Sequence, residues 1–143
     1  MPMFKRGCVV LLVISVAACG GSNSTPTAPT LVKRVVTSGS ASPAAHSSRF
    51  VAFSTTVQGQ LDVTVSWTFA SNTVWVDVAL TANCSSDQFV AGTCQFVVSN
   101  RSSSTAPQKT VSVPGLSPGA YTLFIDNRGP ADESLTYEVD ITS

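Results

Sequence analysis

The chain has 143 residues, of which 43% are hydrophobic and 11% are charged. This length fits a single domain, and the low charge with the high apolar content excludes a charge-rich disordered protein. Residues 1–48 carry four basic side chains and no acidic one, whereas residues 49–143 carry four basic and all eight acidic side chains. A mildly acidic domain therefore follows a basic leader, without the basic stripe that is typical of nucleic-acid-binding proteins.

Residues 1–18 have the pattern of a bacterial export signal. Lys5 and Arg6 precede an apolar run over residues 7–17, which is shorter than the ~20 residues that a membrane-spanning helix requires. The Val-Ala-Ala-Cys sequence at residues 16–19 then resembles the lipobox of bacterial lipoproteins, in which a signal peptidase cuts before the cysteine.

The resemblance implies cleavage between Ala18 and Cys19, after which the Cys19 sulfur receives diacylglycerol. Acyl chains such as palmitate on this residue form a durable membrane anchor, because each buried methylene contributes about 0.8 kcal/mol. Gly20 stands where an Asp favours inner-membrane retention of lipoproteins, so the resemblance favours export to the outer membrane of the cell envelope. The alternative is an ordinary secretory signal that is removed after Ala18, with no role for Cys19.

Residues 19–48 comprise Cys19 and a linker rich in Gly, Ser, Thr, Pro and Ala. Such a composition buries too little apolar surface to offset the entropy of ordering, so we expect a flexible spacer. The sequence Leu-Val-Lys-Arg-Val-Val at residues 31–36 interrupts this pattern. We expect an edge strand or a plain linker there, and a basic clip on anionic lipid is the alternative.

From residue 49 onward the hydrophobic pattern has a period of two. Apolar residues alternate with polar ones over residues 61–69 and 135–142, which is typical of half-buried strands. Seven or eight short strands without a helical period predict an all-β fold, an antiparallel β-sandwich or jelly roll over residues 49–143. The other predicted strands span residues 49–56, 74–80, 94–99, 109–113 and 121–126.

The order of several motifs agrees with this fold. Gly-Gln-Leu at residues 59–61 and Val-Asp-Val-Ala-Leu at residues 76–80 precede Leu-Ser-Pro-Gly-Ala-Tyr at residues 116–121. In the last motif a Pro-Gly turn leads Tyr121 into a strand, and its hydroxyl is expected to return to the turn backbone as in a tyrosine corner. The series resembles the bacterial pre-peptidase C-terminal (PPC) domain, a jelly-roll-like sandwich appended to secreted proteases and other exported proteins. The chain departs from that family in an extra loop at residues 84–94.

Cys84 and Cys94 remain once the leader, with Cys8, is removed and Cys19 is lipidated. In an exported domain such a pair predicts a disulfide. A metal site is disfavoured, because the spacing and the lack of a nearby His do not fit a zinc ligand set.

The sequence offers few catalytic groups. The single histidine, His46, lies in the linker, so a Ser–His–Asp or Cys–His arrangement has no base within the domain. The adjacent Asp132 and Glu133 are expected in a solvated loop, and Asp77 and Asp126 are expected to face water from their strands. We therefore expect no enzymatic activity.

We expect no cofactor, and a calcium-binding site is the alternative. Asp126, Asn127 and Asp132 are candidate oxygen ligands near one loop, and calcium takes six to eight oxygens. Residues 20–61 contain no Asp or Glu. Collagen-binding relatives of the PPC fold carry their calcium-binding acids in that region, so this part of the resemblance does not transfer.

Exposed aromatic side chains would suit a carbohydrate-binding module. Trp75 and Phe124 are out of phase with the apolar residues of their strands, so we expect them on an outer face. Phe89, within the cysteine loop, is a candidate for a further contact. Trp67 belongs to the apolar side of its strand and is expected in the core.

Three functions fit these observations. The first is a non-catalytic lipoprotein, anchored in the membrane, that presents the stapled sandwich to a protein or another envelope component. The second is a carbohydrate-binding module. The third, by analogy with PPC domains alone, is an accessory domain that assists an exported enzyme. We favour the first, because the chain combines an anchor and a spacer with few catalytic groups.

Overall fold

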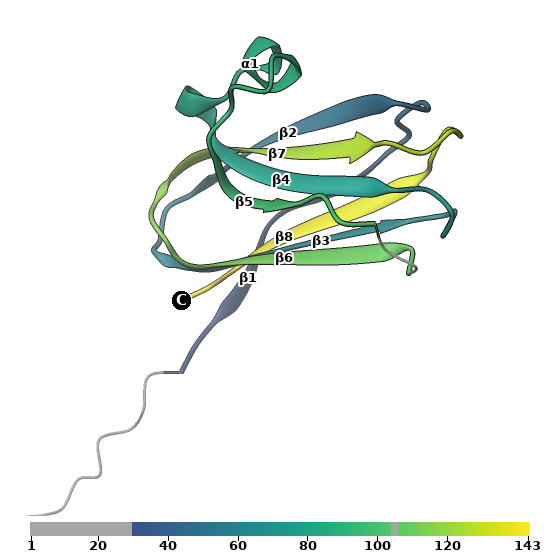
Figure 1. The fold of residues 1–143 in the computed structure, drawn as a ribbon. Coiled ribbons are helices and arrows are strands. Elements are labelled where there is room, and N and C mark those ends of the chain that lie inside the picture. Colours follow the sequence, from purple (N-terminus) through teal and green to yellow (C-terminus); the bar gives the residue numbers. More distant parts are fainter. Residues whose placement is uncertain (1–29, 104–105) are drawn as a thin grey trace, which may run out of the picture.

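The computed structural model describes residues 30–103 and 106–143, which form a sandwich of two four-stranded sheets (Figure 1). The strand orders are β1-β8-β3-β6 and β2-β7-β4-β5, and neighbouring strands are antiparallel. The predicted all-β sandwich is thus confirmed. Its elements are β1 (Lys33–Ala41), β2 (Ser47–Thr55), β3 (Gly59–Trp67), β4 (Val74–Leu80), η1 (Thr81–Asn83), α1 (Ser86–Val90), β5 (Phe96–Asn100), β6 (Gln108–Leu116), β7 (Gly119–Asn127) and β8 (Leu135–Thr142).

The period-two pattern of the sequence forms the core between the sheets. In β3 the side chains of Leu61, Val63 and Val65 are fully buried, and Trp67 is 5% exposed at the end of the same row. The predicted core position of Trp67 is confirmed. Each large apolar side chain buried in this way contributes about 2 kcal/mol, so the inward rows of the two sheets are the main source of stability.

The sandwich begins earlier in the chain than the composition predicts. β1 pairs with β8 from Lys33 to Ala41, and β2 starts at Ser47. The prediction of a flexible linker is therefore wrong for residues 33–48, and the predicted edge strand at residues 31–36 is confirmed from Lys33 onward. Ladder hydrogen bonds to β8 and the packing of Val36 against the core order a segment that is polar by composition. The predicted signal peptide and Cys19 lie outside the described residues.

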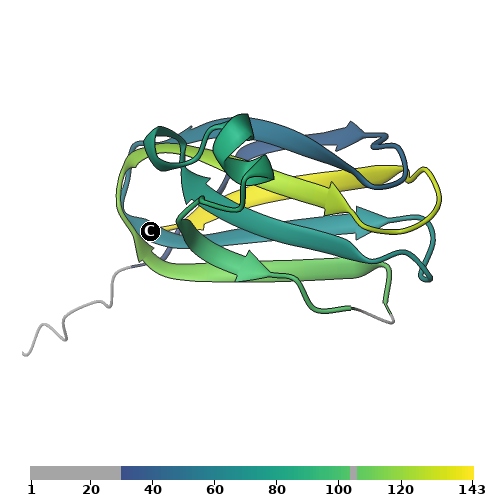
Figure 2. The same cartoon turned by 45° about the horizontal axis from the view of Figure 1, so that its top comes forward.

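The two ends of the sandwich carry different parts of the chain (Figures 1 and 2). The end that we call proximal holds the start of β1, the β2–β3 loop, the β6–β7 turn and the C-terminal Ser143. The end that we call distal holds the β1–β2, β3–β4 and β7–β8 loops. Val32 and Ser143 exchange backbone hydrogen bonds of 2.9 and 3.2 Å. The chain therefore enters and leaves the domain at the proximal end.

The β6–β7 turn contains the predicted tyrosine corner. The Tyr121 hydroxyl donates a hydrogen bond of 2.8 Å to the carbonyl oxygen of Ser117, and the ring stacks on Phe53 with the two centres 5.6 Å apart. The prediction that this hydroxyl returns to the turn is confirmed. Gly115, with φ of +65°, lets the chain enter the turn in the left-handed region.

Candidate functional site

The outer face of the sheet β2-β7-β4-β5 is half covered by the loop between β4 and β5. Cys84 and Cys94 form a disulfide across this loop, with their Cα atoms 4.8 Å apart, which confirms the predicted bridge. The short helix α1 begins in a capping box, in which the Ser85 hydroxyl accepts from the Gln88 amide and the Gln88 side chain accepts from the Ser85 amide. The cap and the disulfide together hold the loop over the sheet.

The covered half of this face is an aromatic cluster. Phe124 is 1% exposed and stacks against Phe89 of the loop, with ring centres 4.7 Å apart. Phe50 and Phe96 contact Phe124 edge-on at 5.2 and 5.9 Å. The expectation of an exposed Phe124 is therefore wrong, and Phe89 serves as its lid rather than as a ligand contact. The out-of-phase pattern placed Phe124 on the outer face correctly, but the loop buries that part of the face.

The uncovered, distal half of the face holds three side chains that we call the arginine–tryptophan stack: Trp75, Arg101 and Arg128. The guanidinium carbons of Arg101 and Arg128 lie 5.2 and 4.4 Å from the centre of a Trp75 ring. Arg101 follows β5 and Arg128 follows β7, the two strands that flank β4. Cations thus reach the half-buried indole from the two strands that flank β4, and their attraction to the π-system is favourable. The guanidinium groups also occupy the surface on which a sugar would stack.

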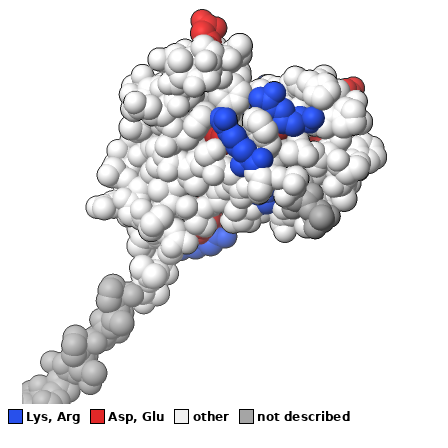
Figure 3. Space-filling model, viewed as in Figure 1, with Lys and Arg blue, Asp and Glu red and all other residues white. Residues whose placement is uncertain are grey.

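Two buried carboxylates hold the stack from below. Asp77 accepts hydrogen bonds of 3.0 Å from Nε of Arg101 and 2.5 Å from the Ser99 hydroxyl, and its side chain is fully buried. Asp126 pairs with Nε of Arg128 at 2.5 Å. The expectation that both acids face water is wrong, because Arg101 beyond the end of β5 covers Asp77, and Arg128, two residues further along the chain, covers Asp126. Figure 3 shows basic side chains side by side on this face, with little acidic surface between them.

The outer nitrogens of the stack face solvent. The side chains of Arg101 and Arg128 are 41% and 46% exposed. Within the described residues, Nη1 of Arg101 and both Nη atoms of Arg128 have no hydrogen-bond acceptor. Unused guanidinium donors at fixed positions are suited to a carboxylate or phosphate of a partner.

Lys109 adds a third cation behind the stack. Its ammonium group donates to the carbonyl oxygens of Val74, Asn100 and Ser102 at 2.6, 3.3 and 2.7 Å. Burial lowers the pKa of Lys109 from its ordinary value of 10.5, and the nearby Asp77 partly opposes this change. The cation thereby joins the ends of β4 and β5 under the stack and keeps local charge positive.

The distal loops are tied together by a third buried acid, Glu133, which the sequence predicts in a solvated loop. Glu133 is 1% exposed and accepts hydrogen bonds from the backbone amides of Thr68 at 2.7 Å and Phe69 at 3.2 Å. The side-chain amide of Asn72 donates a further bond of 2.8 Å. The expectation of a solvated Glu133 is wrong, because the β3–β4 loop directs its donors at this carboxylate. Its neighbour Asp132 is exposed.

The candidate calcium ligands have protein partners instead. Asp132 accepts a hydrogen bond from the Ala45 amide at 3.0 Å, and Asn127 donates to the carbonyl oxygens of Ala44 and Ala131. No three His, Cys, Asp or Glu side chains gather as ligands of one metal ion within residues 30–103 and 106–143. These residues therefore stabilise loops, and the calcium hypothesis gains no support from their geometry. The single histidine, His46, is exposed in the β1–β2 loop.

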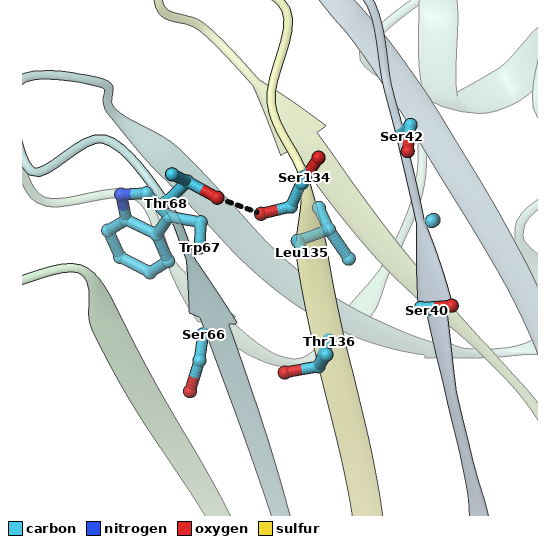
Figure 4. A pocket seen from close by; sticks show the side chains of 9 residues that line it. Ser40, Ser42, Ser66, Trp67, Thr68, Ser134, Leu135 and Thr136 are labelled. Carbon is cyan, nitrogen blue, oxygen red and sulfur yellow. Dashed lines mark hydrogen bonds between the residues drawn. The ribbon is translucent and has the colours of Figure 1, made fainter.

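A hollow lies at the distal end of the other sheet (Figure 4). It is lined by hydroxyl groups of β1, β3 and β8, among them Ser40, Ser66 and Thr136. At its rim the Thr68 hydroxyl donates to the Ser134 carbonyl oxygen at 3.1 Å. No charged side chain lines it, so it offers less specific chemistry than the arginine–tryptophan stack.

Fold and site together define an all-β sandwich with a disulfide-bonded loop over one face and a cationic stack beside it. No model of a known protein family matches the sequence, and no curated protein matches it either. Among the helices of the described segments, none has the length and apolar character needed to cross a membrane. The resemblance to PPC domains stays a prediction.

Proposed function

We propose that this protein is a non-catalytic lipoprotein of the cell envelope that presents the distal end of its sandwich to an anionic partner. The observation that supports this proposal is that the chain enters at one end of the sandwich and the arginine–tryptophan stack lies toward the other. The predicted lipid site, Cys19, precedes the proximal end by only 14 residues, because β1 starts at Lys33. An anchor at Cys19 would therefore hold the proximal end near the membrane and leave the distal end and the arginine–tryptophan stack accessible.

The distal end is suited to binding because it is preorganised. Glu133 joins the β3–β4 and β7–β8 loops, and Asn127 joins the β1–β2 and β7–β8 loops. Loops that are already ordered lose little conformational entropy on association. The exposed guanidinium donors of Arg101 and Arg128 favour carboxylate or phosphate groups on the partner, either on a protein or on another envelope component.

The alternative of a carbohydrate-binding module loses its three candidate contacts. Phe124 is buried, Phe89 covers it, and guanidinium groups occupy the indole of Trp75. The alternative of an accessory domain for an exported enzyme rests on fold analogy and has no specific observation in its favour. A lipid-anchored binding protein uses the stack, the loops and the leader together.

The anchor is tested by metabolic labelling of bacteria with an alkyne analogue of palmitate. The wild-type chain should carry the label and sediment with outer membranes, and Cys19→Ser should carry none. Unlabelled wild-type protein in the soluble fraction would contradict the anchor and favour an ordinary secretory signal.

The partner site is tested with the mature chain, residues 19–143, immobilised and exposed to a detergent extract of envelopes. Trp75→Leu should weaken binding of the captured partner by about tenfold, because it removes the ring against which the two partner-binding guanidinium groups are held. High salt should also weaken it, because the contacts are charged. Val90→Ser removes an exposed apolar side chain from α1, outside the distal loops, and is the matched control. Equal capture by Trp75→Leu and wild type would remove the stack from the proposal.

A further inference from the structure

We propose that the proximal end of the sandwich is a lipid-contacting surface, which inserts apolar side chains of the entry segment into the membrane interface. This inference rests on the proposed anchor. It names the membrane as the partner of the proximal end, opposite the proposed binding site at the distal end. Leu31 and Val35 are 71% and 58% exposed, and Val32 is 44% exposed. In a soluble domain, exposed apolar side chains gathered in one place mark an interaction surface.

The apolar character continues on the other edge of the same end. Leu80 at the end of β4 and Val97 in β5 are 37% and 39% exposed. They border a hollow whose other walls include Val113, Leu116 and Pro118 around the β6–β7 turn. Five of the eight exposed large apolar side chains of the described residues are thus at the proximal end, where β1 enters and β6 turns into β7.

The charges at this end are compatible with a lipid headgroup region. Arg34 is exposed beside Val35, and Lys33 is 60% exposed while it pairs with Asp140 and lies near Glu138 and Asp62. The β2–β3 loop and the β6–β7 turn contain no acid. Asp87 of α1 belongs to the remaining proximal connection, and Figure 1 shows α1 above the sheet on the side away from the entering chain. Basic residues near a membrane are attracted to anionic lipids.

The length of the chain between Cys19 and the domain favours the membrane as the partner of the proximal end. Eleven peptide steps separate Cys19 from Thr30, the first described residue. Even a fully extended chain covers at most about 40 Å over that distance. A nine-residue strand such as β1 is itself about 30 Å long. A lipidated Cys19 would therefore keep the proximal end within about one domain length of the bilayer, and Leu31 would be the first apolar side chain of the domain to meet it.

The test is vesicle flotation of the mature chain with Cys19→Ser, which lacks the acyl chains. The probes are vesicles of phosphatidylethanolamine with phosphatidylglycerol and vesicles of zwitterionic lipid alone. We expect the protein to float with the anionic vesicles. The double variant Leu31→Ser with Val35→Ser should lower the bound fraction about fivefold or more, and Arg34→Gln should lower it about fivefold on anionic vesicles. Phe69→Ser, at the distal end, is the matched control and should bind as the parent does.

Two results would overturn the inference: no flotation of the unlipidated chain, or equal flotation of the Leu31 and Val35 double variant and the parent. Circular dichroism of each variant excludes unfolding as the cause of a loss. The anchor is judged separately, because palmitate labelling uses the wild-type Cys19 and flotation does not. Labelling without flotation would support lipidation of Cys19 and contradict the lipid-contacting surface. Flotation without labelling would support the surface and contradict lipidation.

Discussion

The side-chain amide of Asn72 donates a hydrogen bond of 2.8 Å to the carboxylate of Glu133, inside the distal end of the sandwich. The contact joins two loops that are 61 residues apart in the chain. Gly129 lies against the same amide, and a Cβ there would clash with Oδ1 of Asn72. Asn72 is thus closely packed between Gly129 and Glu133, and polar groups join the two loops.

Glu133→Ala should destabilise the domain by about 2–4 kcal/mol, because the buried side-chain amide of Asn72 and the part-buried backbone amides of Thr68 and Phe69 lose a charged acceptor. Asp132→Ala is the matched control, since this exposed neighbour accepts one hydrogen bond, from Ala45; it should cost at most about 1 kcal/mol. Urea unfolding of the three proteins measures both values. A cost for Glu133→Ala as small as that of the control would show that the loops are not held by this carboxylate.

The fold could be predicted from the sequence because the strands are marked by local alternation. The inward row of β3 and the tyrosine corner are visible without any partner strand. β1 could not be separated from the linker in the same way. Its composition is that of a spacer, and its order comes from pairing with β8, about a hundred residues later in the chain.

The site was less predictable, because burial on the outer face depends on which loop folds back over it. The period placed Phe124 outward, but its environment comes from Phe89 in the disulfide loop. Asp77 was expected in water, and a residue beyond the end of the next strand, Arg101, covers it. The turn residues Asn72, Asn127 and Gly129 are the available signal for ordered distal loops, and they do not indicate that Glu133 accepts a hydrogen bond from Asn72.

Arg101→Gln should cost about 2 kcal/mol of stability, because it leaves the buried carboxylate of Asp77 without its cation. The figure lies below that for a fully buried pair because the arginine is 41% exposed and already partly solvated. A double-mutant cycle with Asp77→Asn should give a coupling energy of about 1–2 kcal/mol. Additive effects of the two substitutions would contradict a direct pair.

Stability should fall as pH rises above 10, in part through Tyr121. Burial raises the pKa of Tyr121 above the ordinary value of 10.0. The unfolded chain then releases this proton at a lower pH than the folded chain does, so the unfolded state binds fewer protons and the free energy of unfolding decreases with pH. Tyr121→Phe should cost about 1 kcal/mol at neutral pH through the lost bond to Ser117, and should flatten the alkaline decline.

Urea titrations of wild type and Tyr121→Phe at neutral pH and above pH 10 check this prediction. Lys33 and Lys109 have perturbed pKa values in the opposite directions, raised by the hydrogen bond to Asp140 and lowered by burial. Both lysines are present in the two proteins, so their contributions cancel in the difference. Parallel pH profiles would show that Tyr121 is not a source of the decline.

Loss of the Cys84–Cys94 disulfide should destabilise the domain by about 2.5–3 kcal/mol, the chain-entropy value for a loop closed by residues ten apart. The double variant Cys84→Ser with Cys94→Ser should unfold at the same denaturant concentration as reduced wild type, and a reductant should leave the variant unchanged. Phe89→Ala, with the disulfide intact, removes the lid from Phe124 alone. If the bridge acts by holding that lid in place, Phe89→Ala should destabilise the wild type by more than it destabilises the double serine variant. Equal costs in the two backgrounds would mean that the disulfide and the aromatic cluster stabilise the sandwich independently.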